Sequence, residues 1–410
     1  MEVSRFTLEN GLRLVHLLDE STEMVHVNIL YGVGAKNEDY EYTGLAHLLE
    51  HLMFGGTELF PSFDDPLEEA GADSNAFTNN DFTNYYISLP RMNAELAFCM
   101  ESDRMCNLLL DEESVDVQRQ VVMEEFKQSY LNKPYGDVNA IMRKLSFKTH
   151  PYRWSTIGRK LKHIADVPVE VVRDFYNRHY TPGNAVLSVV GNISFEQAKE
   201  WTQKWFASIP ARECVKREIP IEARQERMRR RSVTRNVPGN ALYMTFHMDS
   251  FTGSGYYPAD VISDIFANGY SGRLNEILVK RKKLFTRIDA FITSNEHPGL
   301  FWIHSRLADG VTFERAEAAI WEELDKLKER EVPRSEMEKV RNRFESDQVF
   351  SNSSGETLAA NLAQAEWYGD VSRAWRETEL YRKVTPKEVQ QAARELFRKG
   401  NASVLYYKKS

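Results

Sequence analysis

An internal repeat constrains the fold of this chain more than any other feature of its sequence. Pro168-Val169-Glu170-Val171 opens a helical stretch, and Gly183-Asn184-Ala185 then leads into a strand-like run. The same order returns with Pro386-Lys387-Glu388-Val389 and Gly400-Asn401-Ala402, and the step from Gly183 to Gly400 is 217 residues in a chain of 410. Self-similarity at about half the chain length indicates duplication. The repeat therefore predicts two similar halves, each ending in a helix, a Gly-Asn turn and a strand.

Strand-like and helical patterns are mixed within each half. Strand patterns cover residues 12–18, 25–31, 83–89, 241–248 and 301–305. Helical periodicity covers residues 93–110, 112–131, 312–328 and 335–350. Elements of these lengths, mixed in this way, predict an α+β fold. We expect two homologous domains, each a mostly antiparallel sheet with helices packed on one face.

A charged segment that is poor in aromatic residues lies between the halves. It predicts a linker over 212–235, which joins a first domain at 1–211 to a second at 236–410. The linker contains the basic cluster Arg227, Arg229, Arg230 and Arg231. A nucleic-acid patch is one interpretation, but a solvated connector fits the acidic chain better, because the formal net charge is −7.

Composition indicates the cell compartment of the protein and excludes some classes of partner. No apolar stretch approaches the roughly 18 residues that a membrane-spanning helix needs, and the N-terminus lacks a secretory pattern. The three cysteines, Cys99, Cys106 and Cys214, are odd in number and lack a metal-type spacing. Few, unpaired cysteines are typical of a reducing compartment. We therefore expect a cytoplasmic protein with no membrane span and no nucleic-acid partner, in which Cys99 and Cys106 are core thiols.

The segment with the clearest chemistry is a short helical pattern between Thr43 and Gly55-Gly56. Thr43 is a candidate cap and the glycines are a candidate stop, which predicts about three helical turns. His47 and His51 are four residues apart, so both project from one helix face and can reach one metal ion. Glu50 lies beside His51, where a carboxylate can reach a water on that metal without being a ligand. The order His-x-x-Glu-His is that of the inverted zinc-peptidase motif.

Two interpretations of this helix are open from the residues alone. The match can arise by accident in a chain with ten histidines. A metal, however, satisfies polar groups on a leucine-rich helix that is expected to be buried. A catalytic zinc takes three protein ligands, and the motif supplies two. On the helical pattern at 112–131, Glu125 shares a face with Gln118 and Val122, whereas Glu124 points elsewhere, although periodicity alone leaves a solvated Glu125 more probable.

Several further motifs, in order along the chain, carry a resemblance to a known family. They are His47-Leu48-Leu49-Glu50-His51, Gly71-Ala72-Asp73-Ser74-Asn75-Ala76-Phe77-Thr78, Glu101-Ser102-Asp103-Arg104-Met105, Arg119-Gln120-Val121-Val122-Met123-Glu124-Glu125, His150-Pro151-Tyr152 and Tyr180-Thr181-Pro182-Gly183-Asn184-Ala185. With them the sequence resembles the M16 (pitrilysin-type) zinc metallopeptidases over nearly its whole length. The family includes insulin-degrading enzyme and the mitochondrial processing peptidase.

The resemblance implies a function and a set of site residues. It implies Zn²⁺ held by His47, His51 and Glu125, with Glu50 as the base that takes a proton from the metal-activated water and passes it to the leaving amine. Asn75 and Ala76 resemble the edge strand on which the family binds its peptide substrates. From the residues alone, Asn75 is equally consistent with a turn.

Three positions depart from the family pattern. Gln118 stands where the family commonly has a glutamate seven residues before its third zinc ligand, which removes a charge near the metal. In the second domain, Val279 and Thr286 align with the Arg and Tyr that bind substrate and stabilise the oxyanion in the family. Neither residue is a strong donor to an oxyanion. The second domain is expected to lack zinc ligands.

Two functions remain open from the sequence. The first is a zinc endopeptidase subunit that acts on peptides, as a homodimer or a heterodimer with a second M16-like chain that carries the missing Arg and Tyr. The second is a non-catalytic M16-like structural or assembly subunit. Intact His47, Glu50, His51 and Glu125 favour the first function, whereas Val279 and Thr286 keep the second open.

Overall fold

The computed structural model describes residues 2–212, 218–267 and 271–410. The described residues form two compact units, and neither is one continuous stretch of chain. The first unit contains residues 1–127, 154–219 and 348–376, and the second contains residues 128–153, 220–347 and 377–410. The predicted domains at 1–211 and 236–410 stay a prediction, because the units follow spatial contacts rather than the repeat.

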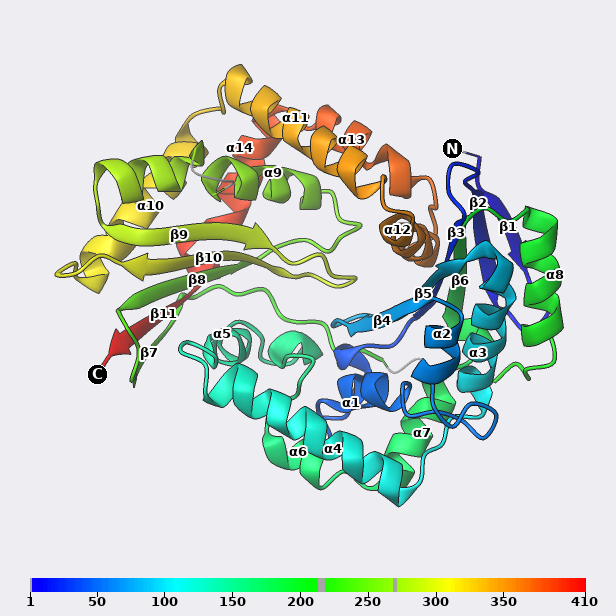
Figure 1. Ribbon diagram of the computed structural model, residues 1–410. Helices are drawn as coiled ribbons and strands as arrows, with labels where there is room; N and C mark the ends of the chain where they lie inside the picture. The colour runs from blue at the N-terminus through cyan, green and yellow to red at the C-terminus, as the bar shows by residue number, and fades with distance from the viewer. Residues whose placement is uncertain (1, 213–217, 268–270) are drawn as a thin grey trace. The chain divides into compact units, whose positions relative to one another are not determined.

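The first unit is built on a six-stranded sheet (Figure 1). Its strands, in spatial order, are β1 (Ser4–Thr7), β2 (Arg13–Leu18), β6 (Ala185–Gly191), β3 (Met24–Tyr31), β5 (Thr83–Pro90) and β4 (Asp73–Thr78). Only the β2–β6 pair is parallel among these neighbours. The helices that lie wholly in this unit are α1 (Leu45–Leu52), α2 (Asp64–Glu69), α3 (Ala94–Cys106), α4 (Glu112–Phe126), α6 (Leu161–Ala165), α7 (Val169–His179), α8 (Phe195–Phe206) and α12 (Gly355–Trp367).

The second unit repeats this arrangement with one strand fewer. Its five-stranded sheet has the order β7 (Arg229–Arg235), β11 (Ala402–Lys409), β8 (Ala241–His247), β10 (Leu300–Leu307) and β9 (Phe285–Ile292). Only the β7–β11 pair is parallel among its neighbours. The helices that lie wholly in this unit are α5 (Val138–Ser146), α9 (Tyr256–Ala267), α10 (Phe313–Glu329) and α14 (Pro386–Leu396). The chain passes between the units within α11 (Arg334–Ser351) and α13 (Arg373–Lys383).

The predicted repeat is visible as a shared local structure. In both units a helix, α7 or α14, is followed by a short 3₁₀ turn and by the strand that has the sheet's one parallel neighbour. The amide of Asn184 donates to the carbonyl of His179 at 2.9 Å, and the amide of Asn401 donates to the carbonyl of Leu396 at 2.8 Å. Both asparagines are buried. Each therefore satisfies a carbonyl at the end of its helix, which explains why the Gly-Asn turn recurs in the sequence.

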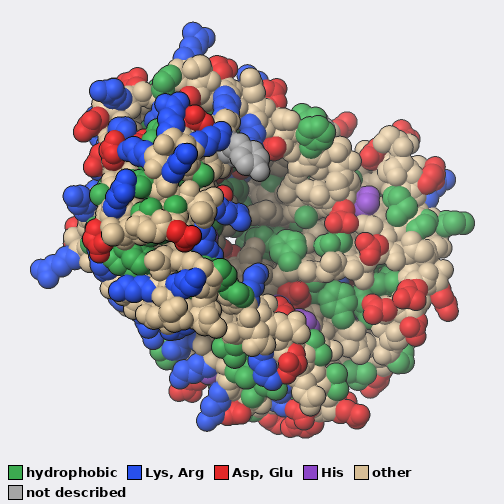
Figure 2. All heavy atoms as spheres, turned by 60° about the vertical axis from the view of Figure 1, so that its left-hand side comes forward, with side chains coloured by type: hydrophobic (Ala, Val, Ile, Leu, Met, Phe, Trp, Pro, Cys, Tyr) green, Lys and Arg blue, Asp and Glu red, His purple; other side chains and the backbone are tan. Residues whose placement is uncertain are grey.

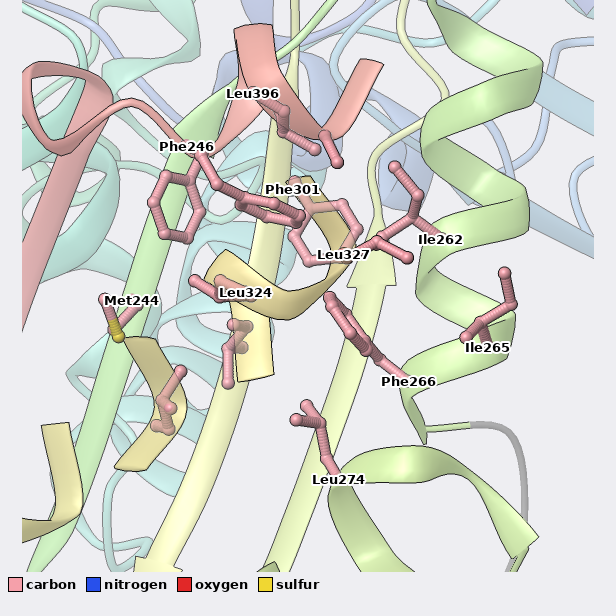
Figure 3. Close-up of a cluster of buried hydrophobic side chains, with 14 of the residues drawn as sticks. Met244, Phe246, Ile262, Ile265, Phe266, Leu274, Phe301, Leu324, Leu327 and Leu396 are labelled. Atoms are coloured by element: carbon pink, nitrogen blue, oxygen red, sulfur yellow. The ribbon is translucent and has the colours of Figure 1, made fainter. Parts of the chain in front are cut away.

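The predicted α+β class with two mostly antiparallel sheets is confirmed, but helices cover both faces of each sheet. In the second unit α9, α10 and α14 pack on the face that carries Met244, Phe246 and Phe301 (Figure 3). The opposite face, which carries Tyr243, Trp302 and Leu405, packs against α5. Sequence periodicity shows that a strand has two faces but does not show which distant helix covers the second.

Each of these second faces is covered by a helix from the other half of the sequence. Helix α5 precedes residue 211 and yet packs on the second unit's sheet, whereas α12 follows residue 236 and packs on the first. Leu358 and Leu362 of α12 lie against Val15, Leu30 and other apolar side chains of the first sheet. On the opposite face of the first sheet, His16 packs against Phe195 of α8, and the centroids of the two rings are 5.8 Å apart. The two halves thus exchange one helix each.

The predicted linker at 212–235 contains a strand, so its last part is not a connector, although most residues of this strand are exposed to solvent as predicted. Residues 229–235 form β7, which pairs with β11 in parallel. Arg230 on this strand forms an ion pair with Glu317 of α10 at 2.8 Å and lies near the ring of Tyr406, so a carboxylate of the same unit balances its charge. Residues 213–217, which include Cys214, lie outside the described residues.

The surface, the helices and the cysteines bear on the expected cytoplasmic protein without a membrane span. In the view of Figure 2, most Lys and Arg side chains lie toward the left and Asp and Glu side chains predominate toward the right, with apolar side chains among both. No helix in the described ranges combines the length and the apolar character needed to cross a bilayer. Cys99 and Cys106 are free and half-buried on α3 rather than core thiols. The cytoplasmic location stays a prediction.

Candidate metal centre

The helix that carries the two histidines begins differently from the prediction. Helix α1 has eight residues, about two turns, and its N-terminal cap is Gly44, whose φ of 95° is in the left-handed region that favours glycine. Thr43 does not cap it. The Thr43 hydroxyl instead accepts from the Arg159 backbone N–H at 2.9 Å and contacts His163 Nδ1 at 3.0 Å.

The side chain that caps the start of α1 is Glu38, which lies outside the predicted motif. Its carboxylate accepts from the backbone N–H groups of Gly44 at 2.9 Å and Ala46 at 3.0 Å, and from the Trp154 indole N–H at 3.0 Å. Burial raises the pKa of Glu38 to about 8, although these donors oppose the shift. The start of α1 is therefore fixed by a buried carboxyl group, since the first N–H groups of a helix have no partners within it.

His47 and His51 lie side by side on α1, as their spacing predicts. Their ring centroids are 4.8 Å apart and the rings are nearly perpendicular. Leu48, Leu49 and Leu52 are buried and anchor the helix. Burial is the main cause that lowers the pKa of His47 to about 4, so this imidazole is neutral at pH 7 and can bind a metal without losing a proton.

Helix α4 brings Glu125 to the two histidines. The helix begins at Glu112 behind Asp111, whose carboxylate accepts from the Ser114 N–H at 2.8 Å. Glu125 Oε2 lies 3.6 Å from His47 Nε2 and 3.5 Å from His51 Nε2. The bond with His51 is the largest cause that lowers the pKa of Glu125. The structure thus brings Glu125 to the two histidines. Glu124 is instead exposed and paired with Lys127.

The three side chains fit a zinc ion. One ligand atom from each of His47, His51 and Glu125 lies within 4.8 Å of the others. Tetrahedral zinc with ligand distances near 2.1 Å places its ligand atoms about 3.4 Å apart, close to the two separations from Glu125. Two imidazoles and a carboxylate are also a ligand set that zinc takes in catalytic sites. The assignment of the metal to these residues stays a prediction, and its test is given below.

Glu50 lies on the same helix and does not join the ligand group. Its carboxylate oxygen Oε2 accepts a hydrogen bond from the hydroxyl of Thr78, the last residue of β4. Burial is the largest cause that raises the pKa of Glu50, and the Thr78 bond and His51 oppose it. A carboxylate with a raised pKa is suited to accept a proton near neutral pH.

The other predicted site residues lie on β4 and α4. Asn75 and Ala76 are in β4, the edge strand of the first sheet, opposite Tyr86 and Tyr85 of β5. Asn75 Oδ1 accepts from the Ala76 N–H at 2.8 Å. Gln118 is half-buried, two helical turns before Glu125. Among the described residues, no hydrogen bond joins Gln118 to His47, whose buried Nδ1 has no partner.

The two residues of the second unit that depart from the family pattern lie in separate elements. Val279 is in a π-helical segment, Asn275–Arg281, and packs against the core, while Thr286 is exposed at the start of β9. The neighbouring Lys280, Arg281 and Lys282 pair with Glu276 or Glu322 at the surface. They form an exposed helix end whose cations pair with nearby carboxylates.

Comparison with known families decides the relationship of the chain. The family described as "Insulinase (Peptidase family M16)" matches residues 14–148, which hold the candidate metal centre. The family described as "Peptidase M16 inactive domain" matches residues 166–344. The chain belongs to the M16 peptidase family. The predicted family is confirmed, and the two matches place the candidate site in the peptidase-type half of this M16 chain.

Individual relatives agree over most of the length of this M16 chain. It is 25% identical over 410 residues to the zinc protease PqqE of Helicobacter pylori, covering 98% of this chain and 92% of that protein. It is 26% identical over 355 residues to the uncharacterized zinc protease YmxG of Bacillus subtilis, covering 85% and 84%. The crystal structure of a protease from Helicobacter pylori superposes with a TM-score of 0.93 at 25% identity, covering 99% of each chain.

Two residues of the M16 site have no recognisable signal in the sequence. Glu38 lies nine residues before His47, and a buried carboxyl at a loop has no periodic signal. Thr78 was within the family motif that ends at Phe77-Thr78, but a single hydroxyl in an alternating strand gives no sign of its partner. Both act on α1 across distances that only folding closes.

Proposed function

We propose that this chain is a zinc-dependent endopeptidase subunit that hydrolyses peptide bonds. The observation that carries the proposal is the convergence of His47, His51 and Glu125 on one point, with the half-buried carboxylate of Glu50 on the same helix. The M16 relatives named zinc proteases support the same class of chemistry.

Each residue has a part in the proposed mechanism. His47, His51 and Glu125 would hold the ion, which when bound supplies Lewis acidity toward a water molecule and the scissile carbonyl. Glu50 takes the proton from that water and delivers it to the leaving nitrogen. Thr78 engages one carboxylate oxygen, Oε2, and Oε1 is the oxygen we assign to proton transfer. Burial raises the pKa of Glu50, which favours uptake of the proton.

We place the substrate on β4. This strand has one partner, β5, and no other described strand pairs with its outer edge. An extended peptide can add to such an edge through backbone hydrogen bonds, with little demand on its sequence. Asn75 and Ala76 would then contact the peptide three and two residues before Thr78, which bonds to the base.

Metal analysis of purified protein tests the ligand assignment. We expect about one zinc per wild-type chain, and we expect His51→Ala and Glu125→Gln to lose most of it, because each removes one of three ligands. Glu124→Gln is the matched control, since that neighbouring carboxylate is exposed and paired with Lys127. Full zinc occupancy in His51→Ala or Glu125→Gln, or equal loss in Glu124→Gln, would contradict the assignment.

The alternative function, a non-catalytic M16-like subunit, is supported by a specific observation. Val279 and Thr286 stand at the positions that the family resemblance assigns to oxyanion donors, and Val279 is partly buried against a hydrophobic core. The second half also matches a family described as inactive.

For the peptidase, the same two positions imply that the oxyanion donors come from elsewhere. We propose that it works as a heterodimer, in which a second M16-like chain supplies those donors, rather than as a homodimer.

Reconstitution tests the need for a partner. We expect chelator-sensitive cleavage of a peptide library to be at least about 100-fold faster for the chain with its M16-like partner than for the chain alone, because each missing oxyanion donor costs about that much. Vigorous cleavage by the isolated chain would contradict the partner proposal but not the peptidase. Absence of cleavage in both samples, with zinc bound, would favour the structural subunit.

A further inference from the structure

We infer that Thr78 is a positioning residue for Glu50, held in place by a row of buried hydroxyl groups that extends into the first unit. The inference rests on the proposed function, because it assigns a role in the same reaction. It concerns a residue whose side-chain hydrogen bonds go to Glu50 and Thr83.

The bond joins two elements that are remote in sequence. Thr78 is the last residue of β4, and Glu50 is in α1, twenty-eight residues earlier. The Thr78 hydroxyl donates to Glu50 Oε2. Thr78 is opposite Thr83 in the β4–β5 ladder, and their hydroxyl oxygens are 3.2 Å apart. Thr83 is fully buried, so the oxygen behind Thr78 has a fixed position.

The row continues through two tyrosines. Tyr180 is hydrogen-bonded to Thr83, and the hydroxyls of Tyr180 and Tyr85 are 2.9 Å apart. Both tyrosines are fully buried. Burial raises the pKa of each well above its usual value, so both keep their protons and remain donors. Four hydroxyl groups thus lie in sequence behind the carboxylate.

Proton counting sets the direction of the bond between Thr78 and Glu50. Each hydroxyl has one proton, and the Thr83 hydroxyl donates its proton to the carbonyl of Val33, 2.9 Å away. Thr78 therefore keeps its own proton for Glu50, and Thr83, 3.2 Å away, limits where the Thr78 oxygen can lie. The bond from Thr78 favours one orientation of the Glu50 carboxylate.

This orientation matters because a free carboxylate rotates about its last torsion. Terminal torsions of this kind are broad and have no sharp preferred angle. A base that must face both the attacking water and the leaving nitrogen loses rate when its oxygen moves by about 1 Å. Thr78 also belongs to the strand on which we place the substrate, so one hydrogen bond fixes the base relative to that strand.

Kinetics of Thr78 variants test the inference. Valine matches threonine in shape and suits a strand, so Thr78→Val removes the hydroxyl and keeps the backbone ladder. In the chain with its partner we expect kcat to fall about tenfold or more, with KM and zinc content within about twofold of wild type. Thr78→Ser is the matched control, since it keeps a hydroxyl and should restore most of kcat. An unchanged kcat in Thr78→Val, or equal losses in both variants, would overturn the inference.

A second measurement needs no activity. In the metal-free chain, Thr78→Val should lower the denaturant midpoint of unfolding, because Glu50 then loses a donor while half-buried. In a Glu50→Ala background the same change should shift the midpoint less than half as much. Equal shifts would overturn the link between the two side chains. If the wild-type chain binds no zinc and cleaves nothing with any partner, the proposed function fails instead, and the unfolding comparison still decides whether Thr78 holds Glu50.

Discussion

Glu50→Gln is expected to reduce peptide hydrolysis by about 100-fold or more while leaving zinc content and fold unchanged. Glutamine has nearly the same shape and can still accept the Thr78 hydrogen bond through its amide oxygen. It cannot take a proton from water, so the loss falls on the chemical step. The measurement is kcat for a fluorogenic peptide, with metal analysis and a melting curve on the same sample.

The outcome separates Glu50 from its neighbours on α1. A histidine variant such as His51→Ala should lose zinc and activity together, whereas Glu50→Gln should lose activity alone. A decrease smaller than about tenfold in Glu50→Gln would show that another group carries the proton. Loss of zinc in Glu50→Gln would instead show that this carboxylate is a ligand.

A chain that ends at residue 347 lacks α12 of the first unit and α14 and β11 of the second, so it is expected to lose the fold of both units and with it zinc binding. Helix α12 covers one face of the first sheet, where Val15, Leu17, Leu30, Val186 and Val190 are buried against it. Exposing five such side chains costs about 10 kcal/mol at roughly 2 kcal/mol each. A loss of that size is comparable to the whole stability of a typical domain. Circular dichroism and metal analysis of the fragment are the measurements.

Complementation provides the control for this truncation. Adding a synthetic peptide of residues 348–376, the segment that belongs to the first unit, should restore zinc binding to the fragment. A point variant provides a graded version: Leu362→Ala, at a fully buried position of α12, should lower the free energy of unfolding by about 2–5 kcal/mol, whereas Gln364→Ala should change it little. A truncated chain that folds and holds zinc without the peptide would contradict the expectation.

The exchange of α5 and α12 explains why the predicted domains and the compact units differ. The repeat in the sequence reports common ancestry, and it is preserved in α7 and α14 with their buried Asn184 and Asn401. Packing follows a different rule, because each sheet has two apolar faces and both must be covered. The covering helices come from the opposite halves, so residues 128–153 and 348–376 change places between the two units.

The sequence by itself determined what depends on short-range periodicity. A spacing of four places His47 and His51 on one face of α1 in any helix, and the i to i+7 relation places Glu125 on the face of Gln118. The repeat likewise predicted two similar halves, because the helix, Gly-Asn turn and strand are local features. The family resemblance then assigned roles to these residues.

Only the tertiary structure decided which distant groups meet those of α1. Thr43 is adjacent to the helix and was the predicted cap, yet Glu38 reaches the N–H groups of Gly44 and Ala46 because the preceding loop folds back under them. Thr78 reaches Glu50 because the edge strand β4 lies beside α1. The physical reason is the same in each case: a hydrogen bond depends on the separation of two atoms in space, whereas the pattern along a sequence reports only separations along the chain.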